Sequence, residues 1–200
     1  MKRIFTYRLL YIYALLILSI STAWGQCELN IIDKPMKIGM QISSMRNISA
    51  VIVHSTFNNS GGEKYDIDLI IKQFARYGVS SHYVIGRDGS IYRLVDEINI
   101  AFQAGKSVLP NAQKDVNSVS IGIELMTSFD EAPTEAQIQA LVLLVKDIQK
   151  RFKIEYILRH SDIAPGRKTD PWNMDWEDFL QRMKLDFEFE IPFQMQTCGF

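Results

Sequence analysis

The segment 159-RHSDIAPGRKTDPW-172 gathers side chains that can bind a metal ion or move a proton. It contains His160, Lys168 and Asp170 together with two prolines and one glycine. Proline fixes φ and removes a backbone donor, and glycine opens conformations that other residues avoid, so we expect an irregular loop rather than a regular element. Loops of this kind often carry reactive residues, although a charged surface loop without a function would have a similar composition.

Three apolar runs of strand length end at or near an ionisable residue. His54 follows the run VIV, Glu124 follows IGI, and His160 lies just beyond YIL. In open α/β sheets, sites assemble where the carboxyl ends of strands meet, a rule that applies chiefly to parallel sheets. We therefore expect these three side chains to converge at one edge of a sheet.

The residue types favour metal-assisted hydrolysis. Burying His54, His160 and Asp170 without compensation would be costly, so they should pair with one another or bind a metal. Two neutral imidazoles and one carboxylate are a hydrolytic zinc set that leaves the fourth tetrahedral position open for water. One Zn²⁺ ion would lower the pKa of that water toward about 7 and polarise a carbonyl. Glu124, with a pKa raised by its apolar strand, could act as general base, and Lys168 could stabilise an oxyanion.

Each candidate also has a structural interpretation. A single histidine at a strand end is more often structural than a ligand, Glu124 could be a solvated strand edge, and Lys168 could be a solvated cation. His54 lies 106 positions before His160, so their spacing is not a compact metal motif. The remaining histidine, His82, begins a strand, and we expect a structural or supporting role for it.

Two further pairs have open interpretations. Trp172 and Trp176 could line a groove for sugar or peptide, or they could pack in the core. Asp130 and Glu131 look like solvated loop charges.

Hydrophobic patterning predicts the elements that position these residues. We expect strands at 49–56, 82–86, 90–95, 119–125 and 154–160, with a hairpin around the RDG turn. Amphipathic helices are expected at 66–78, from Thr134 through Ile148, and from about Asp175 to Met183. This alternation predicts the α/β class, as a single domain with a mixed central β-sheet flanked by α-helices.

The first 25 residues have the layout of a signal peptide. Basic residues precede an apolar run from Leu9 to about Ile20, and small residues occupy the −3 and −1 positions before a cleavage site after Gly25. The run is shorter than the ~20 apolar residues of a membrane span. We therefore expect export to the periplasm or medium, with an uncleaved anchor as the alternative. The other expected segments are a lead-in at 26–47, a catalytic domain at 48–185 and a tail at 186–200.

Charge and cysteine content restrict the partners. Cleavage after Gly25 removes three of the 22 basic residues and no acidic ones, which leaves 19 against 23 and a net charge of −4. With no basic run, such a chain is a poor match for nucleic acid or an anionic membrane. Cys27 and Cys198 could form a disulfide in an oxidising compartment, or Cys27 could be lipidated, although Trp24-Gly25-Gln26 is a poor lipobox.

Five segments give the chain a family resemblance over residues 48–182. In order they are VIVHST, SSHYVIGRDGSIYRLV, AFQAGKS, NSVSIGIEL and RHSDIAPGRKTDP. This order resembles the N-acetylmuramoyl-L-alanine amidases of the type 2 amidase and peptidoglycan recognition protein superfamily. The resemblance implies a mixed sheet flanked by helices, one zinc ion, and hydrolysis of the amide between the lactyl group of N-acetylmuramic acid and L-alanine of the stem peptide.

The resemblance also assigns roles to individual residues. By position, His54, His160 and Asp170 match the family's zinc ligands, Glu124 its catalytic glutamate and Lys168 its catalytic lysine. Members that only bind peptidoglycan lack part of the zinc set, which is whole in this chain.

Two departures from the family pattern concern substrate contacts. Exported relatives often have AWHAG where this chain has AFQAG with Phe102 and Gln103, and Trp172 follows Asp170-Pro171 where a small residue is common.

The expected function is therefore an exported zinc amidase acting on peptidoglycan or muropeptides. The alternatives are a peptidoglycan-binding module without turnover and a zinc peptidase that cuts within the stem peptide. A toxin role, with a cognate immunity protein as partner, is a further possibility on which the sequence is silent.

Overall fold

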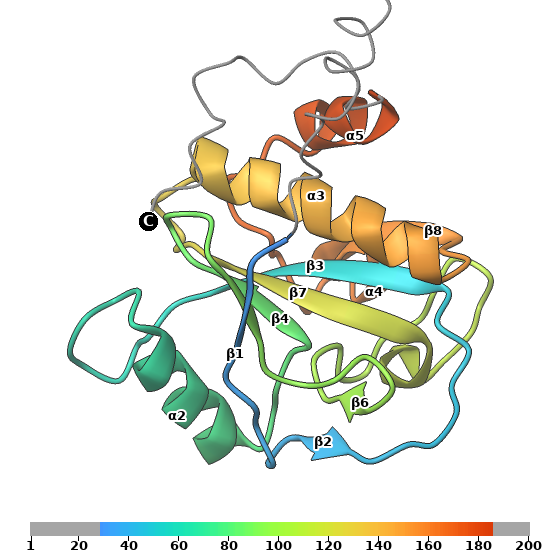
Figure 1. Ribbon diagram of the computed structural model, residues 1–200, viewed down its shortest axis with the longest axis horizontal. Helices are drawn as coiled ribbons and strands as arrows, with labels where there is room; N and C mark the ends of the chain where they lie inside the picture. Colours follow the sequence, from blue (N-terminus) through green and yellow to red (C-terminus); the bar gives the residue numbers. More distant parts are fainter. Residues whose placement is uncertain (1–28, 186–200) are drawn as a thin grey trace, which may run out of the picture.

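The computed structural model describes residues 29–185, whose centre is a six-stranded sheet with the order β1-β5-β4-β7-β3-β8 (Figure 1). Its strands are β1 (Ile31–Asp33), β3 (Ala50–Thr56), β4 (Tyr83–Ile85), β5 (Ile91–Arg93), β7 (Ser120–Met126) and β8 (Tyr156–Arg159). A second sheet pairs β2 (Met40–Gln41) with β6 (Ile100–Ala101). In the large sheet, β4 and β5 are antiparallel and the other neighbouring strands are parallel, which confirms the mixed sheet.

Helices cover both faces of the large sheet. They are α2 (Ile67–Tyr77), α3 (Glu135–Arg151), the single turn α4 (His160–Ile163) and α5 (Trp176–Lys184), with a 3₁₀ helix at Val116–Val119. One face packs Val53 of β3 and Ile123 of β7 against α3, with α5 beyond it. The other face packs Val84 of β4 against α2. Residues 29–185 therefore form the predicted α/β domain, a mixed sheet flanked by helices, with helices on both faces.

Local capping signals explain why the two long helices begin where the sequence predicts. The Asp66 carboxylate accepts hydrogen bonds from the backbone N–H groups at the start of α2, and Gly78 ends that helix at φ +64°. At the start of α3, Thr134 and Gln137 form a reciprocal capping box.

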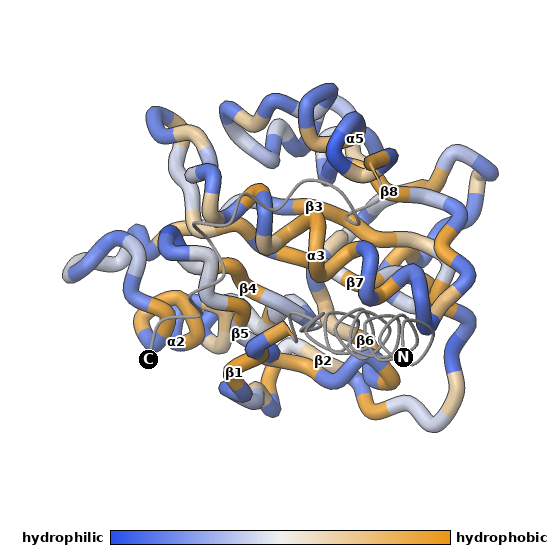
Figure 2. The backbone as a smooth tube through the Cα atoms, turned by 45° about the horizontal axis from the view of Figure 1, so that its top comes forward, coloured by the Kyte–Doolittle hydropathy of each residue, from blue (hydrophilic) through white to orange (hydrophobic). Residues whose placement is uncertain are grey.

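The central strands are buried on both faces. Every residue of β3 and β7 is buried, as is usual for parallel strands covered by further layers. Figure 2 shows these strands as largely hydrophobic, whereas the outer loops are mostly hydrophilic. A rigid, apolar support of this kind fixes the position of any polar side chain at a strand end.

Two expectations of irregular structure were wrong. The lead-in at 26–47 contains β1, which pairs in parallel with β5, and β2. These strands have only three and two residues, too few for a hydrophobic period to be visible. The segment 159–172 is also not wholly irregular, because His160–Ile163 forms one helical turn. Pro165 and Gly166 come only after this turn, so they end it rather than prevent it.

Several expectations fall outside residues 29–185. The signal peptide at 1–25, the two cysteines and the tail at 186–200 are among them, and the boundaries of the catalytic domain stay a prediction. Between residues 29 and 185, no helix combines the length and the hydrophobicity that a membrane crossing needs.

Candidate metal centre and active site

Neighbouring parallel strands bring His54 and Glu124 together. The two residues are register partners in β3 and β7. Their sequence neighbours Val53 and Ile123 pack toward α3, so by strand alternation His54 and Glu124 lie on the opposite face of the sheet. His160 follows β8, the other neighbour of β3, and begins α4. All three therefore lie at the carboxyl end of adjacent strands, as the sequence predicts.

His54, His160 and Asp170 converge on a single buried point. The Nδ1 atoms of the two imidazoles are 2.8 Å apart. Asp170 Oδ2 lies 3.0 Å from His160 Nδ1 and 3.5 Å from His54 Nδ1. These atoms all lie within 4.8 Å of one another, close enough to share one metal ion. The segment that the sequence singled out thus meets a strand 106 residues earlier in the chain.

The chemistry of these three donor atoms fits a cation. His160 Nε2 lies 3.2 Å from the carbonyl oxygen of Ala104. Since a carbonyl only accepts, Nε2 of a neutral ring carries the proton and Nδ1 turns its lone pair toward Asp170. Two acceptors then face each other, which a shared cation would stabilise. Two imidazole nitrogens and one carboxylate oxygen are also the ligand set of an open hydrolytic zinc site.

Burial and mutual contacts hold these groups in the forms that bind metals. Burial lowers the pKa of His54 to about 4, which favours the neutral imidazole at neutral pH. Burial by itself would raise the pKa of Asp170, but hydrogen bonds and charge from His160 and His54, when Nδ1 carries a proton, more than offset this and lower the pKa well below the usual value; a bound cation would take the place of those protons. The carboxyl is therefore ionised and the His54 ring neutral, as metal ligation requires.

Glu124 and Lys168 supply an acid–base group and a positive charge beside this cluster. Glu124 is buried, and its Oε2 atom has no hydrogen-bond partner among residues 29–185. Burial, followed by the nearby Asp170 charge, raises its pKa to about 8, while the Lys168 charge acts in the opposite direction. Lys168 is half-buried, and its backbone N–H donates to Ala164 O at 3.0 Å.

A protein-family model described as N-acetylmuramoyl-L-alanine amidase matches residues 44–173. The chain belongs to this amidase family. Among curated relatives, the N-acetylmuramoyl-L-alanine amidase AmiD of Escherichia coli K12 is 33% identical over 172 residues, which cover 73% of this chain and 59% of AmiD. A 1,6-anhydro-N-acetylmuramyl-L-alanine amidase, AmpD of Haemophilus influenzae, is 39% identical over 110 residues, 53% of this chain and 59% of AmpD. The chain thus spans about three fifths of the length of these two relatives.

Solved amidase structures share the fold. A selenomethionine derivative of AmpD superposes with a TM-score of 0.65 at 28% identity, covering 76% of this chain and 93% of that one. AmiD of E. coli, in complex with anhydro-N-acetylmuramic acid-L-Ala-D-gamma-Glu-L-Lys, gives a TM-score of 0.59 at 30% identity and covers 71% of this chain and 60% of AmiD. These matches confirm the family resemblance and the fold inferred from the sequence motifs.

His82 lies outside the cluster of His54, His160 and Asp170. It is fully buried, its Nδ1 accepts from Gly122 N–H at 3.0 Å, and its Nε2 lies 3.1 Å from the carbonyl oxygen of Asn99. Both ring nitrogens therefore hold backbone segments together. Burial, together with the nearby Arg46 charge, lowers the pKa of His82 to about 3. The histidine has the structural role expected for it.

Gln103, which belongs to one of the two departures from the family pattern, lies near His54. Its Nε2 donates to Ser120 Oγ at 2.8 Å, which leaves Oε1 as a buried acceptor. Neither that atom nor His54 Nε2 has a hydrogen-bond partner in the described part of the chain, although the Gln103 side chain is near enough to counter in part the effect of burial on the pKa of His54. Gly122 makes room for it, since a Cβ there would lie 2.6 Å from Gln103 Cγ.

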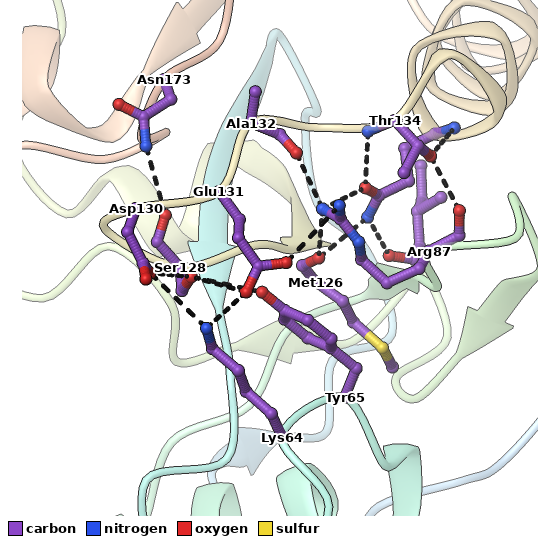
Figure 3. Close-up of polar contacts among 12 residues, drawn as sticks. Lys64, Tyr65, Arg87, Met126, Ser128, Asp130, Glu131, Ala132, Thr134 and Asn173 are labelled. Atoms are coloured by element: carbon purple, nitrogen blue, oxygen red, sulfur yellow. Dashed lines mark hydrogen bonds and ion pairs between the residues drawn. The ribbon is translucent and has the colours of Figure 1, made fainter.

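The acidic pair after β7 keeps the solvent exposure expected of loop charges, with side chains 81% and 38% exposed, and it also faces cations. Glu131 Oε1 lies 2.5 Å from Lys64 Nζ, and Asp130 Oδ1 lies 3.5 Å from the same atom. Glu131 also faces Arg87 at 3.7 Å (Figure 3). Exposed pairs such as these are screened by solvent and contribute little to stability. Their effect is to fix the loop between β7 and α3 rather than to stabilise the domain.

The buried Glu124 predicts a pH-dependent stability in metal-free protein. The pKa of Glu124 is about 8 in the folded protein and 4.5 when the side chain is exposed, so between these pH values the folded protein binds a proton that the unfolded chain has released. The contribution of this proton to the free energy of unfolding is greatest below pH 4.5 and is lost as pH rises toward 8. Between pH 6.5 and 8 we expect the free energy of unfolding to fall by roughly 1–2 kcal/mol.

Urea unfolding in the presence of a chelator measures this effect. The pKa values of His54 and His82 lie at about 4 and 3, and exposed histidine titrates near 6.5, so these residues act mainly below the chosen window. Glu124→Gln cannot titrate and is the matched control. Equal slopes in wild type and Glu124→Gln between pH 6.5 and 8 would contradict the prediction.

Proposed function

We propose that the protein is a zinc-dependent amidase that hydrolyses the amide between the lactyl group of N-acetylmuramic acid and L-alanine of the peptidoglycan stem peptide. The observation that carries this proposal is the buried convergence of His54, His160 and Asp170 beside Glu124. Membership of the amidase family supports it. The AmiD complex, whose bound substrate joins anhydro-N-acetylmuramic acid to L-Ala, supports the substrate class.

In the proposed reaction, the cation, Glu124 and Lys168 have separate roles. Zinc bound by the two histidines and Asp170 would supply Lewis-acid polarisation of the amide carbonyl and acidify a water molecule. Glu124, through its unpartnered Oε2, takes a proton as the water oxygen attacks the carbonyl carbon. The same carboxyl then donates this proton to the alanine nitrogen as the C–N bond breaks. A pKa near the working pH suits a group that must both accept and donate.

Lys168 stabilises the negative charge that develops on the carbonyl oxygen. Its charge lowers the pKa of Glu124, against the effect of burial, and this proximity supports the role. Lys168→Met keeps the aliphatic stem and removes the charge, so we expect turnover to fall about 100-fold. Metal content should remain at one ion per chain, because Lys168 is not a ligand.

Lys114→Met, at an exposed position, is the matched control for the loss of one lysine. It should keep wild-type turnover. Unchanged turnover in Lys168→Met would remove Lys168 from the mechanism.

Product analysis tests the proposed function directly. The purified chain is incubated with peptidoglycan sacculi and, separately, with soluble anhydro-muropeptides, and the products are identified by mass spectrometry. Free peptides beginning with L-alanine, together with intact glycan, are the expected result. Cuts within the stem peptide would identify a peptidase, and binding without release would identify a non-catalytic module. Elemental analysis should find one zinc ion per chain.

We further propose that the protein is exported and acts in the periplasm or outside the cell. The basic start, the apolar run and the small residues before Gln26 support this proposal. Fractionation of cells that express the full chain, combined with N-terminal sequencing, should find protein outside the cytoplasm that begins at Gln26. An intact N-terminus in the cytoplasmic fraction would contradict it.

A further inference from the structure

Two adjacent residues, Gln103 and Ala104, lie beside both histidines of the candidate metal cluster. The carbonyl oxygen of Ala104 lies 3.2 Å from His160 Nε2 and accepts its proton. Burial lowers the pKa of His54, and the Gln103 side chain is near enough to this ring to act in the opposite direction. The backbone N–H groups of Gln103 and Ala104 both donate to Asn117 Oδ1, at 3.1 and 2.8 Å. One anchored segment thus lies beside both rings.

Gln103 is buried, unlike its neighbour in the AFQAG motif. It is 9% exposed, whereas Phe102 is 38% exposed. The Gln103 side chain lies against Gly122, where a Cβ would come within 2.6 Å of Gln103 Cγ. Gly122 lies two residues before Glu124 in β7 and therefore faces the same way, and Glu124 is the register partner of His54. The Gln103 side chain thus lies inside the domain, on the face of the sheet that carries His54.

Ser120 determines which end of the Gln103 amide points away from it. Ser120 Oγ donates to the carbonyl oxygen of Val116 at 2.6 Å, and a carbonyl oxygen can only accept. Because this bond uses the one hydroxyl proton, Ser120 Oγ must accept from Gln103, whose Nε2 lies 2.8 Å away. The hydrogen-bond network therefore assigns the NH₂ group to the Ser120 end of the amide and Oε1 to the other end.

Gln103 Oε1 and His54 Nε2 are complementary atoms. Both are buried, and neither has a hydrogen-bond partner within residues 29–185. Oε1 can only accept. A neutral His54 ring whose Nδ1 turns its lone pair to a cation beside His160 and Asp170 carries its proton on Nε2, so this nitrogen can only donate. Buried polar groups are usually paired, and a metal-binding histidine usually donates its second N–H to an acceptor.

We propose that Gln103 is a positioning residue for His54, whose Nε2–H donates to Gln103 Oε1 when Nδ1 binds the metal ion. This assignment rests on the proposed function, which requires zinc at the two rings. Together with the Ala104 carbonyl, which accepts from His160, it gives each imidazole an acceptor on one short segment. The two acceptors hold both rings with Nδ1 toward the point that they share with Asp170.

Zinc affinity and the position of the His54 proton test this role without any turnover. The histidines are labelled with nitrogen-15, and long-range proton–nitrogen NMR spectra of the zinc-loaded chain show which ring nitrogen carries a proton. Wild type should show a proton on His54 Nε2 that exchanges slowly with water. Gln103→Met keeps the length of the side chain and removes the acceptor. It should speed this exchange and weaken zinc binding about tenfold, measured by competition with a chelator.

Three further variants separate the loss of an acceptor from a change in packing. Gln103→Glu keeps an oxygen acceptor and should bind zinc more tightly than Gln103→Met. Gln113→Met makes the same exchange at an exposed position and should behave as wild type does. Ser81→Ala removes a buried hydroxyl that also lies beside Gly122 and has no partner within residues 29–185, and it should leave the His54 signal unchanged.

The outcomes separate this role from the proposed function. If wild type binds zinc and Gln103→Met changes neither zinc affinity nor proton exchange, the role of Gln103 is overturned and the zinc site stands. A His54 signal that changes in Ser81→Ala but not in Gln103→Met would make the Ser81 hydroxyl the acceptor, with the same result. In zinc-loaded wild type, a proton on His54 Nδ1, or one on Nε2 that exchanges rapidly, would also overturn the role, even if Gln103→Met does not fold. No zinc binding by wild type would overturn the proposed function itself.

Discussion

Replacing Glu124 with glutamine is expected to reduce turnover at least about 100-fold while the protein keeps its metal. Glutamine has nearly the same shape as glutamate but cannot take a proton from water. Glu124 is not in the His54–His160–Asp170 cluster, so its neutral substitute leaves the cluster intact. Among residues 29–185, its Oε2 is the only buried carboxyl oxygen without a hydrogen-bond partner.

Turnover of a defined muropeptide, measured with zinc content on the same samples, checks this expectation. Glu155→Gln, at an exposed position beside β8, is the control and should match wild type. Activity near that of wild type in Glu124→Gln would show that another group accepts the proton. Loss of metal together with activity would show that Glu124 acts on the cluster rather than on water.

Sequence patterns predicted the part of the site that depends on strand ends. His54 and Glu124 lie near the ends of fully buried strands, and His160 follows the half-buried edge strand β8. Adjacent parallel strands bring such ends together. Asp170 was predictable because it lies only ten residues after His160, and a segment that short keeps its side chains near the first candidate ligand. The apolar runs therefore made both the sheet and the cluster of His54, His160 and Asp170 predictable.

Contacts between loops were not predictable in the same way. Phe57 and Phe129 lie 72 positions apart, each in a loop without periodicity, and only the folded sheet shows that they meet. Their place directly after two strands that carry site residues was the available signal. The ion pairs of Asp130 and Glu131 were not predictable for the same reason, since Lys64, their ionic partner, lies on a different loop.

Gln103 shows how a departure from a family pattern becomes interpretable once the fold is known. In the sequence it is a glutamine in AFQAG at the position where relatives often have the histidine of AWHAG. In the structure it is a buried amide whose orientation Ser120 fixes and whose free oxygen lies near His54.

Replacing Asp170 with asparagine is expected to weaken zinc binding by at least about 100-fold, beyond the 10–100-fold typical of residues that only support a ligand. The substitution keeps the side-chain shape but removes the one negative charge that His54 and His160 share. Without that charge, the burial of a divalent cation beside two neutral imidazoles is poorly compensated. Zinc affinity can be measured by competition with a chromogenic chelator, which requires no turnover.

Thermal unfolding provides a second, independent readout for Asp170→Asn. A ligand that binds only the folded state raises Tm in proportion to the logarithm of its concentration over Kd, so added zinc should raise the Tm of wild type and leave that of the variant nearly unchanged. Asp96→Asn, with a side chain 67% exposed, should respond as wild type does. Equal zinc affinity and an equal rise in Tm for Asp170→Asn would place the cation elsewhere. A metal-dependent reaction at the His54–His160 pair would then have no structural basis, because the two imidazoles would lack their anionic partner.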